Sequence, residues 1–226
     1  MMSVSHQIFV EQKIKTAQAI AAGCCDGTYA EGALILCSMI SAMSAITWPD
    51  DKKHRNIDRK RFVELITRFP SPGIDPQKVS LPLFVQDEKA CNSRIDISKK
   101  SFHLTDDNDL NETDVVKSCP GLSLRKIRNY SYANLLYEQI RCGYMHLYMT
   151  DDKASELDPL NKGGISYVNR NKNNTTYRVI FFSLQWIASV AESVARGLDM
   201  ERSRQGKTPF DDLYFEFPSK WWLEGA

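Results

Sequence analysis

Apolar residues recur at helical spacing in five stretches of the chain, separated by polar or irregular segments. In the first stretch Ile8, Ile14 and Ala17 alternate with charged residues, which predicts an amphipathic helix. The second stretch is apolar on nearly every side, which predicts a helix inside a bundle. The five predicted helices cover residues 4–22, 29–48, 59–69, 132–148 and 183–202.

Polar residues mark where these helices begin. Thr28 is followed three residues later by Glu31, which matches a capping box at the start of the second helix. Asp58 is expected to cap the third helix, and Ser183 marks the start of the last one. The sequence therefore defines both the period and the start of several helices.

Two β-rich segments precede the last helix. Residues 164–169 and 175–182 are rich in β-branched and aromatic side chains, and the Asn-rich residues 170–174 join them, which predicts a β-hairpin. The fold class is therefore mainly α: a bundle of about five helices with a hairpin inserted before the last helix. No domain boundary is evident, so residues 1–226 are taken as one domain.

The stretch 73–121 is irregular and is interpreted as an insertion in the bundle. Within it, residues 79–85 are compatible with a short extended segment. Residues 106–114 hold five acidic side chains and are expected to form a solvated loop. The sequence assigns this insertion no role.

Composition narrows the function classes. A formal net charge of +1 does not predict strong non-specific nucleic-acid binding, although a local basic groove is compatible with it. The six cysteines show no C-x-x-C spacing, so neither a disulfide framework nor a zinc site is expected, and a reducing cytoplasmic compartment is predicted. Residues 32–48 are uncharged but short and contain hydroxyl side chains, so a core helix of a soluble protein, without a membrane, is expected.

One pair of side chains stands out chemically. Arg141 and His146 lie five residues apart on the predicted helix 132–148. A guanidinium binds phosphate and an imidazole moves protons near neutral pH, so the pair is suited to phosphodiester cleavage. Five residues rotate about 140° around a helix, so one helix alone does not bring the two side chains together. The spacing by itself favours a structural arginine and an ordinary histidine.

The sequence around this pair resembles the helix with the Arg-x4-6-His motif of the HEPN (higher eukaryotes and prokaryotes nucleotide-binding) superfamily. The string that carries the resemblance is residues 136–146, LYEQIRCGYMH. The small-residue-rich segment 30–46 and the segment 58–65, DRKRFVEL, look like earlier helices of some bacterial members. The resemblance covers these stretches and leaves the middle insertion out.

The resemblance implies a helical bundle that dimerises so that two motif helices face each other. Many members are metal-independent endoribonucleases of toxin–antitoxin, CRISPR-linked or antiphage systems. Carried over, Arg141 would hold the phosphate, His146 would transfer protons, and the RNA 2′-hydroxyl would attack the adjacent phosphate. The implied partners are an RNA substrate, a second copy of the chain, and an antitoxin or effector protein; no cofactor or metal is implied.

One position departs from the family pattern. The residue after the motif arginine is commonly polar in active members, and here it is Cys142. Other members lack nuclease activity and bind a partner protein or nucleotide, which is the alternative function. A helical structural protein unrelated to the family is a third reading.

Four further residues are assigned supporting roles. Glu138 precedes Arg141 by three residues and either orients its guanidinium or forms a plain surface ion pair. Arg125, Lys126 and Arg128 lie just before the motif helix and are candidates for contacting the RNA backbone. The basic run 52–61 is either a further RNA guide or a solvated helix start.

Overall fold

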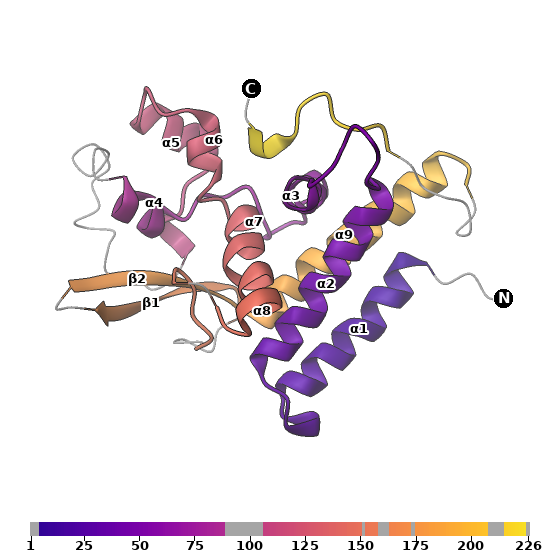
Figure 1. Cartoon of the computed structure of the whole chain (residues 1–226), viewed down its shortest axis with the longest axis horizontal. Helices are drawn as coiled ribbons and strands as arrows, with labels where there is room; N and C mark the ends of the chain where they lie inside the picture. The colour runs from indigo at the N-terminus through magenta and orange to yellow at the C-terminus, as the bar shows by residue number, and fades with distance from the viewer. Residues whose placement is uncertain are drawn as a thin grey trace.

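The structure is a computed structural model that describes residues 5–88, 106–150, 152–157, 163–172, 175–207 and 215–224. The fold is mainly helical with one small antiparallel sheet, as predicted (Figure 1). Its long helices are α1 (His6–Ala21), α2 (Tyr29–Thr47) and α9 (Leu184–Arg204), which pack against one another. The start of the first predicted helix at residue 4, and residues 89–105 of the middle insertion, lie outside the described residues.

The capping box predicted for α2 is confirmed, whereas Ser183, predicted as the first residue of the last helix, is instead its N-cap. The Thr28 hydroxyl accepts from the α2 backbone, and the Thr28 backbone N–H donates to the Glu31 carboxylate at 2.7 Å, which completes the capping box. Ser183 precedes α9, and its hydroxyl accepts from the backbone N–H of Trp186 at 3.0 Å. The prediction for α3 (Asp58–Arg68) is wrong in one detail, because Asp58 is its first helical residue and Ile57 is the N-cap.

The helix that carries Arg141 and His146 runs without a break from residue 132 to 147. It consists of α7 (Tyr132–Leu135), the π-helical segment η4 (Leu136–Arg141) and α8 (Cys142–Leu147), and it is called the motif helix below. The ring of Tyr144 lies 6.3 Å from the ring of Tyr29, at the start of α2. The motif helix therefore packs against α2 in the antiparallel sense.

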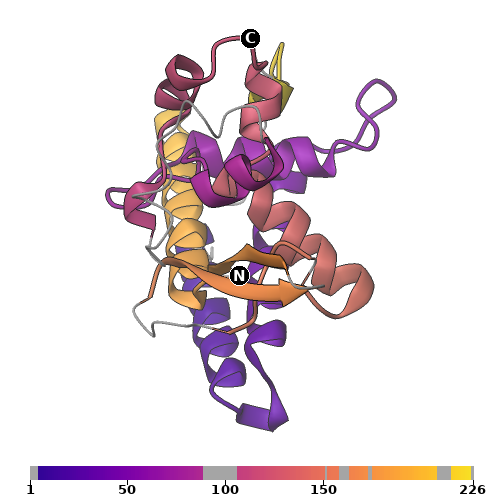
Figure 2. The ribbon, with the colours of Figure 1, turned by 90° about the vertical axis from the view of Figure 1, so that its left-hand side faces the viewer.

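The predicted hairpin is confirmed. Strands β1 (Ile165–Lys172) and β2 (Thr175–Phe182) pair antiparallel, with Ile165 opposite Phe182. β1 continues past the expected end at residue 169, so the connection is shorter than the sequence indicated. Figure 2 shows the hairpin facing the viewer, with α9 on one side and the motif helix on the other.

Parts of the middle insertion differ from the expectation of irregular chain. The expected extended segment 79–85 is instead mostly the helix α4 (Leu81–Asp87), which has a proline in its first turn. Proline is favoured there because the missing N–H needs no partner at a helix start. Further along lie η3 (Asp106–Asn108), α5 (Glu112–Ser118) and α6 (Leu124–Arg128).

The acidic stretch 106–114 is not a fully solvated loop, because Asp109 is buried. The hydroxyls of Tyr132 and Tyr167 both donate to its Oδ2, and the backbone N–H of Leu81 donates to its Oδ1 at 2.8 Å. This cluster joins the insertion to the motif helix and to the hairpin. Burial raises the pKa of Asp109 to about 6, and the three donated hydrogen bonds only partly oppose that effect.

The end of the chain packs back onto α3. Trp48 and Trp221 are both buried, with their rings 5.6 Å apart, and the backbone N–H of Trp222 donates to Glu64 at 2.7 Å. The last described element is η5 (Trp222–Glu224). The aromatic tail is therefore part of the core.

By length and composition α2 alone, among the described helices, could cross a membrane. Half of its apolar window is buried inside the fold, against α1, α9 and the motif helix. These contacts place one face of α2 inside the fold.

Candidate functional site

Arg141 is the last residue of the π-helical segment and lies half-buried. Its guanidinium is 5.1 Å from the centre of the Tyr137 ring, and its Nη1 is 3.8 Å from the Sγ of Cys142. Among the described residues, no carboxylate lies within ion-pair distance of Arg141. The guanidinium therefore contacts an aromatic ring and a thiol, and within the described part of the chain it forms no ion pair with a carboxylate.

The surroundings of Arg141 favour a permanent cation. Burial opposes the charge, but Tyr137, Cys142 and Asp58 together raise the pKa of Arg141 above its ordinary value. Burial also raises the pKa of the nearby Cys37 thiol to about 12, so this α2 side chain stays neutral. The position therefore offers a fixed positive charge to an anion.

His146 lies one turn further along, in α8, and is exposed. It makes no hydrogen bond or ion pair with any residue that the structure describes. An exposed, uncommitted imidazole is free to exchange protons with a bound substrate.

The structure does not bring Arg141 and His146 together within one chain. The segment between them is α-helical, so the two side chains leave the helix about 140° apart. The expectation from the sequence holds here: a single copy presents the two groups in different directions. A site that uses both groups needs a second surface.

Glu138 does not orient Arg141. Its Oε1 lies 2.8 Å from the Nε of Arg59, on α3. The physical reason is the π-helical segment, in which a residue three positions ahead no longer lies on the same face as it would in an α-helix. Glu138 therefore links the motif helix to α3 through an ion pair between two helices, which is neither an orienting contact to Arg141 nor a plain pair on the surface of one helix.

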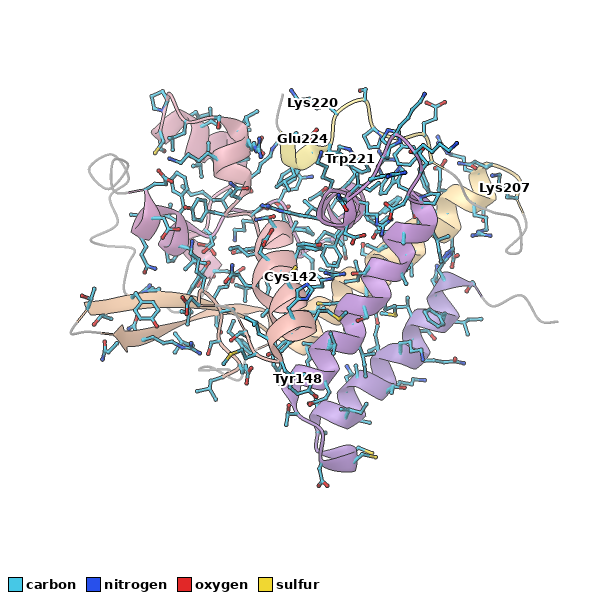
Figure 3. The ribbon with its side chains drawn as sticks, in the orientation of Figure 1. Cys142, Tyr148, Lys207, Lys220, Trp221 and Glu224 are labelled. Atoms are coloured by element: carbon cyan, nitrogen blue, oxygen red, sulfur yellow. The ribbon has the colours of Figure 1, made fainter. Side chains whose placement is uncertain are left out.

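Cys142 follows Arg141 and is half-buried. Figure 3 shows Cys142 midway along the motif helix and Tyr148 at its end, near the start of α2. The Tyr148 hydroxyl donates to Glu31 at 2.6 Å, and Tyr148 itself has a positive φ of 56°. The Tyr148 hydroxyl thus links the end of the motif helix, just after His146, to the α2 capping box.

The three basic residues before the motif helix have different surroundings. Arg125 is exposed, and Lys126 is exposed but lies 2.7 Å from the Glu88 carboxylate. Arg128 is largely buried: its guanidinium pairs with Glu112, donates to the Trp222 carbonyl and stacks over the Trp222 ring. Of the three, only Arg125 presents a side chain without a close acidic partner among the described residues.

Replacing Arg128 with alanine is expected to lower the free energy of unfolding by about 1–3 kcal/mol, because Glu112 and the Trp222 carbonyl lose their donor. The exposed Arg125→Ala is the matched control and should change it by less than about 0.5 kcal/mol. Urea denaturation of both variants measures the difference. Equal stabilities would show that the Arg128 contacts contribute nothing to the fold.

The basic run 52–61 is partly committed to the fold. Arg61 pairs with Asp58 and donates to the Trp48 carbonyl, and Lys60 lies 2.6 Å from Glu224. Lys52 and Lys53 are exposed. The helical half of the run therefore serves mainly to hold α3 in place.

Exposed apolar side chains surround the end of the motif helix. Met145 is 50% exposed and Tyr148 65% exposed. Leu147 and Met149 are also exposed. Large apolar side chains gathered around an uncommitted histidine are typical of a contact surface.

The described residues contain no group of three or more His, Cys, Asp or Glu side chains placed to hold a metal ion.

What the sequence did not reveal is the role of Tyr137. Its ring lies under the Arg141 guanidinium, and the i,i+4 spacing of the two residues was the available signal.

Comparison with known protein families, curated proteins and solved structures finds no match.

Proposed function

We propose that the chain is a metal-independent endoribonuclease of HEPN type that acts in the cytoplasm as a homodimer. The observation that carries the proposal is the state of the motif pair: Arg141 and His146 are free of carboxylate partners among the described residues, whereas their neighbours Glu138 and Arg128 are committed to ion pairs. An exposed histidine without a partner is accessible to a substrate, as a proton-transfer group must be.

The chemistry requires only groups that the pair supplies. His146 takes the proton of the RNA 2′-hydroxyl, whose oxygen attacks the adjacent phosphorus. The bond from phosphorus to the 5′-oxygen breaks, and that oxygen takes a proton from the protonated His146. Arg141 compensates the charge that builds up on the phosphate oxygens. The products are a 2′,3′-cyclic phosphate and a free 5′-hydroxyl.

A dimer supplies the missing second surface. Because Arg141 and His146 point in different directions on one helix, Arg141 of one copy would complete a site with His146 of the other across a two-fold axis. The exposed side chains of Met145, Leu147 and Met149 lie beside His146 and support such a contact. By resemblance, the dimer would act in toxin–antitoxin or antiphage defence, with an antitoxin or effector protein as its partner.

The test is a cleavage assay on mixed RNA in EDTA, with analysis of the product ends. The proposal predicts cleavage that EDTA does not inhibit and fragments that end in a 2′,3′-cyclic phosphate. An absence of cleavage by a folded dimer, or products with 3′-hydroxyl ends, would contradict it.

The alternative function is a non-catalytic module of the same family that binds a partner protein or nucleotide. The position of Arg141, half-buried over the Tyr137 ring and beside Cys142, favours this alternative. An intrachain salt bridge of Arg141 would support it further, and no described carboxylate makes one. A folded dimer that does not cut RNA and binds a nucleotide or a partner protein would support this alternative.

A further inference from the structure

The turn between α1 and α2 carries two adjacent cysteines, Cys24 and Cys25, in the short element η1 (Cys24–Asp26). Both side chains are exposed, and their Sγ atoms lie 3.7 Å apart. Cys37 and Cys119 are buried, and Cys142 is half-buried. Among the described cysteines, this pair alone combines exposure with a second thiol at contact distance.

The backbone holds the pair in an unusual conformation. Cys25 and Asp26 both have a φ of 58°, a left-handed conformation that side-chain-bearing residues seldom adopt. Gly27 follows with no room for a side chain, because a Cβ there would lie 2.3 Å from the Cγ2 of Ile20. Strain of this kind persists where the surrounding structure imposes it, and it is common at functional positions.

We propose that Cys24 and Cys25 form a reversible oxidation site that closes as an intrachain disulfide when the protein meets a hydroperoxide. One thiol attacks the peroxide oxygen and becomes a sulfenic acid, releasing an alcohol. The second thiol attacks that sulfur, the S–S bond forms and water leaves. Two thiols and one hydroperoxide thus give one disulfide, one alcohol and one water, with two electrons passing to the peroxide.

The geometry favours a reversible bond. The sulfurs need to approach from 3.7 Å to about 2.05 Å, a short movement for exposed side chains. Adjacent Cα atoms are only about 3.8 Å apart, closer than the Cα atoms of an ordinary disulfide. The closed ring is therefore strained, and strained, exposed disulfides are the ones that cellular thiols reduce readily.

Closure also affects the start of α2. The carbonyl of Cys24 belongs to the peptide inside the ring, and it accepts from the backbone N–H of Gly27 at 3.2 Å. Rotation of that peptide removes this hydrogen bond, next to the Thr28 cap. Glu31, the other half of the cap, also accepts from Tyr148 at the end of the motif helix. The oxidation state of the turn is thereby transmitted to the α2 cap.

The first test is differential thiol labelling of the full chain after treatment with hydrogen peroxide. Free thiols are blocked with one reagent, disulfides are then reduced, and the released thiols are labelled with a second reagent and mapped by fragmentation. The expected result is the joint transfer of Cys24 and Cys25 to the second label, while Cys37 keeps the first. Retention of the first label at Cys24 and Cys25, or disulfides between chains, would overturn the proposal.

The second test is hydrogen exchange of the amides in residues 28–32 before and after oxidation. Exchange is expected to become faster in the oxidised wild type and to stay unchanged in Cys24→Ser and Cys25→Ser, which cannot close the ring. Equal exchange in oxidised and reduced wild type would contradict the transmission to α2. Neither readout depends on RNA cleavage, so these experiments test the oxidation site independently of the proposed function.

Discussion

Replacing His146 with alanine is expected to slow RNA cleavage by about 10²–10⁴-fold, the range that a positioned proton-transfer group contributes. The residue is exposed and has no partner among the described residues, so its loss should leave the fold and the dimer unchanged. Rates measured on a single labelled RNA under single-turnover conditions give the comparison directly.

Arg141→Ala is expected to slow RNA cleavage by about 10²–10³-fold, because the developing charge on the phosphate loses its fixed cation. Arg141→Lys should recover part of that loss, since lysine keeps the charge without the planar fork. The matched control is Arg196→Ala, at an exposed residue of α9 outside the motif helix, and it should cleave like wild type. Cleavage at the wild-type rate by both His146→Ala and Arg141→Ala would remove the motif pair from the mechanism.

The second large effect concerns the buried carboxyl of Asp109. Its folded-state pKa is about 6, against an ordinary value of 3.8. Well below pH 3.8 both the folded and the unfolded chain hold the proton, and Asp109 imposes no penalty. As the pH rises through 6 the unfolded chain has already lost its proton, so the folded state is destabilised by about 3 kcal/mol, and the penalty is then constant.

The measurement is the free energy of unfolding of wild type and Asp109→Asn between pH 4 and pH 7.5. An asparagine carries no charge, so the stability of wild type relative to the variant should fall by about 2.5 kcal/mol over this range. The difference between the two curves removes the contribution of other titrating groups. Parallel curves would show that Asp109 does not titrate in this window.

The sequence predicted those parts of the fold that depend on local pattern. The helical periods, the Thr28 capping box and the hairpin are all written in neighbouring residues, and the structure contains them. The helix α4 was missed although Ser80 and Pro82 are a helix-start signal, because the short apolar run was assigned to an extended segment.

The environment of Asp109 could not be predicted in the same way. Its partners Tyr132 and Tyr167 lie 23 and 58 residues away in the sequence. A run of acidic residues is usually solvated, and only tertiary packing selects which one is buried. The burial of Arg128 against Glu112 and Trp222 is a similar long-range effect.

In the candidate site, too, the local pattern predicted some features and could not predict others. The pattern placed Arg141 and His146 on one helix and indicated that they diverge, and the helix geometry agrees. The pattern could not reveal the π-helical segment, which turns Glu138 toward Arg59, because the backbone period is not visible in residue types. Catalysis and dimerisation stay predictions that experiment must test.

The most direct test of a shared site is complementation between two inactive variants. Arg141→Ala and His146→Ala chains are co-expressed with different tags, and the mixed dimers are isolated through both tags. Each mixed dimer would hold one complete site, against two in wild type, so about half of the wild-type cleavage rate is predicted. Mixed dimers of either variant with the double variant serve as the inactive control. If the mixed dimers are no more active than that control, Arg141 and His146 do not act together across a dimer, and the account is contradicted.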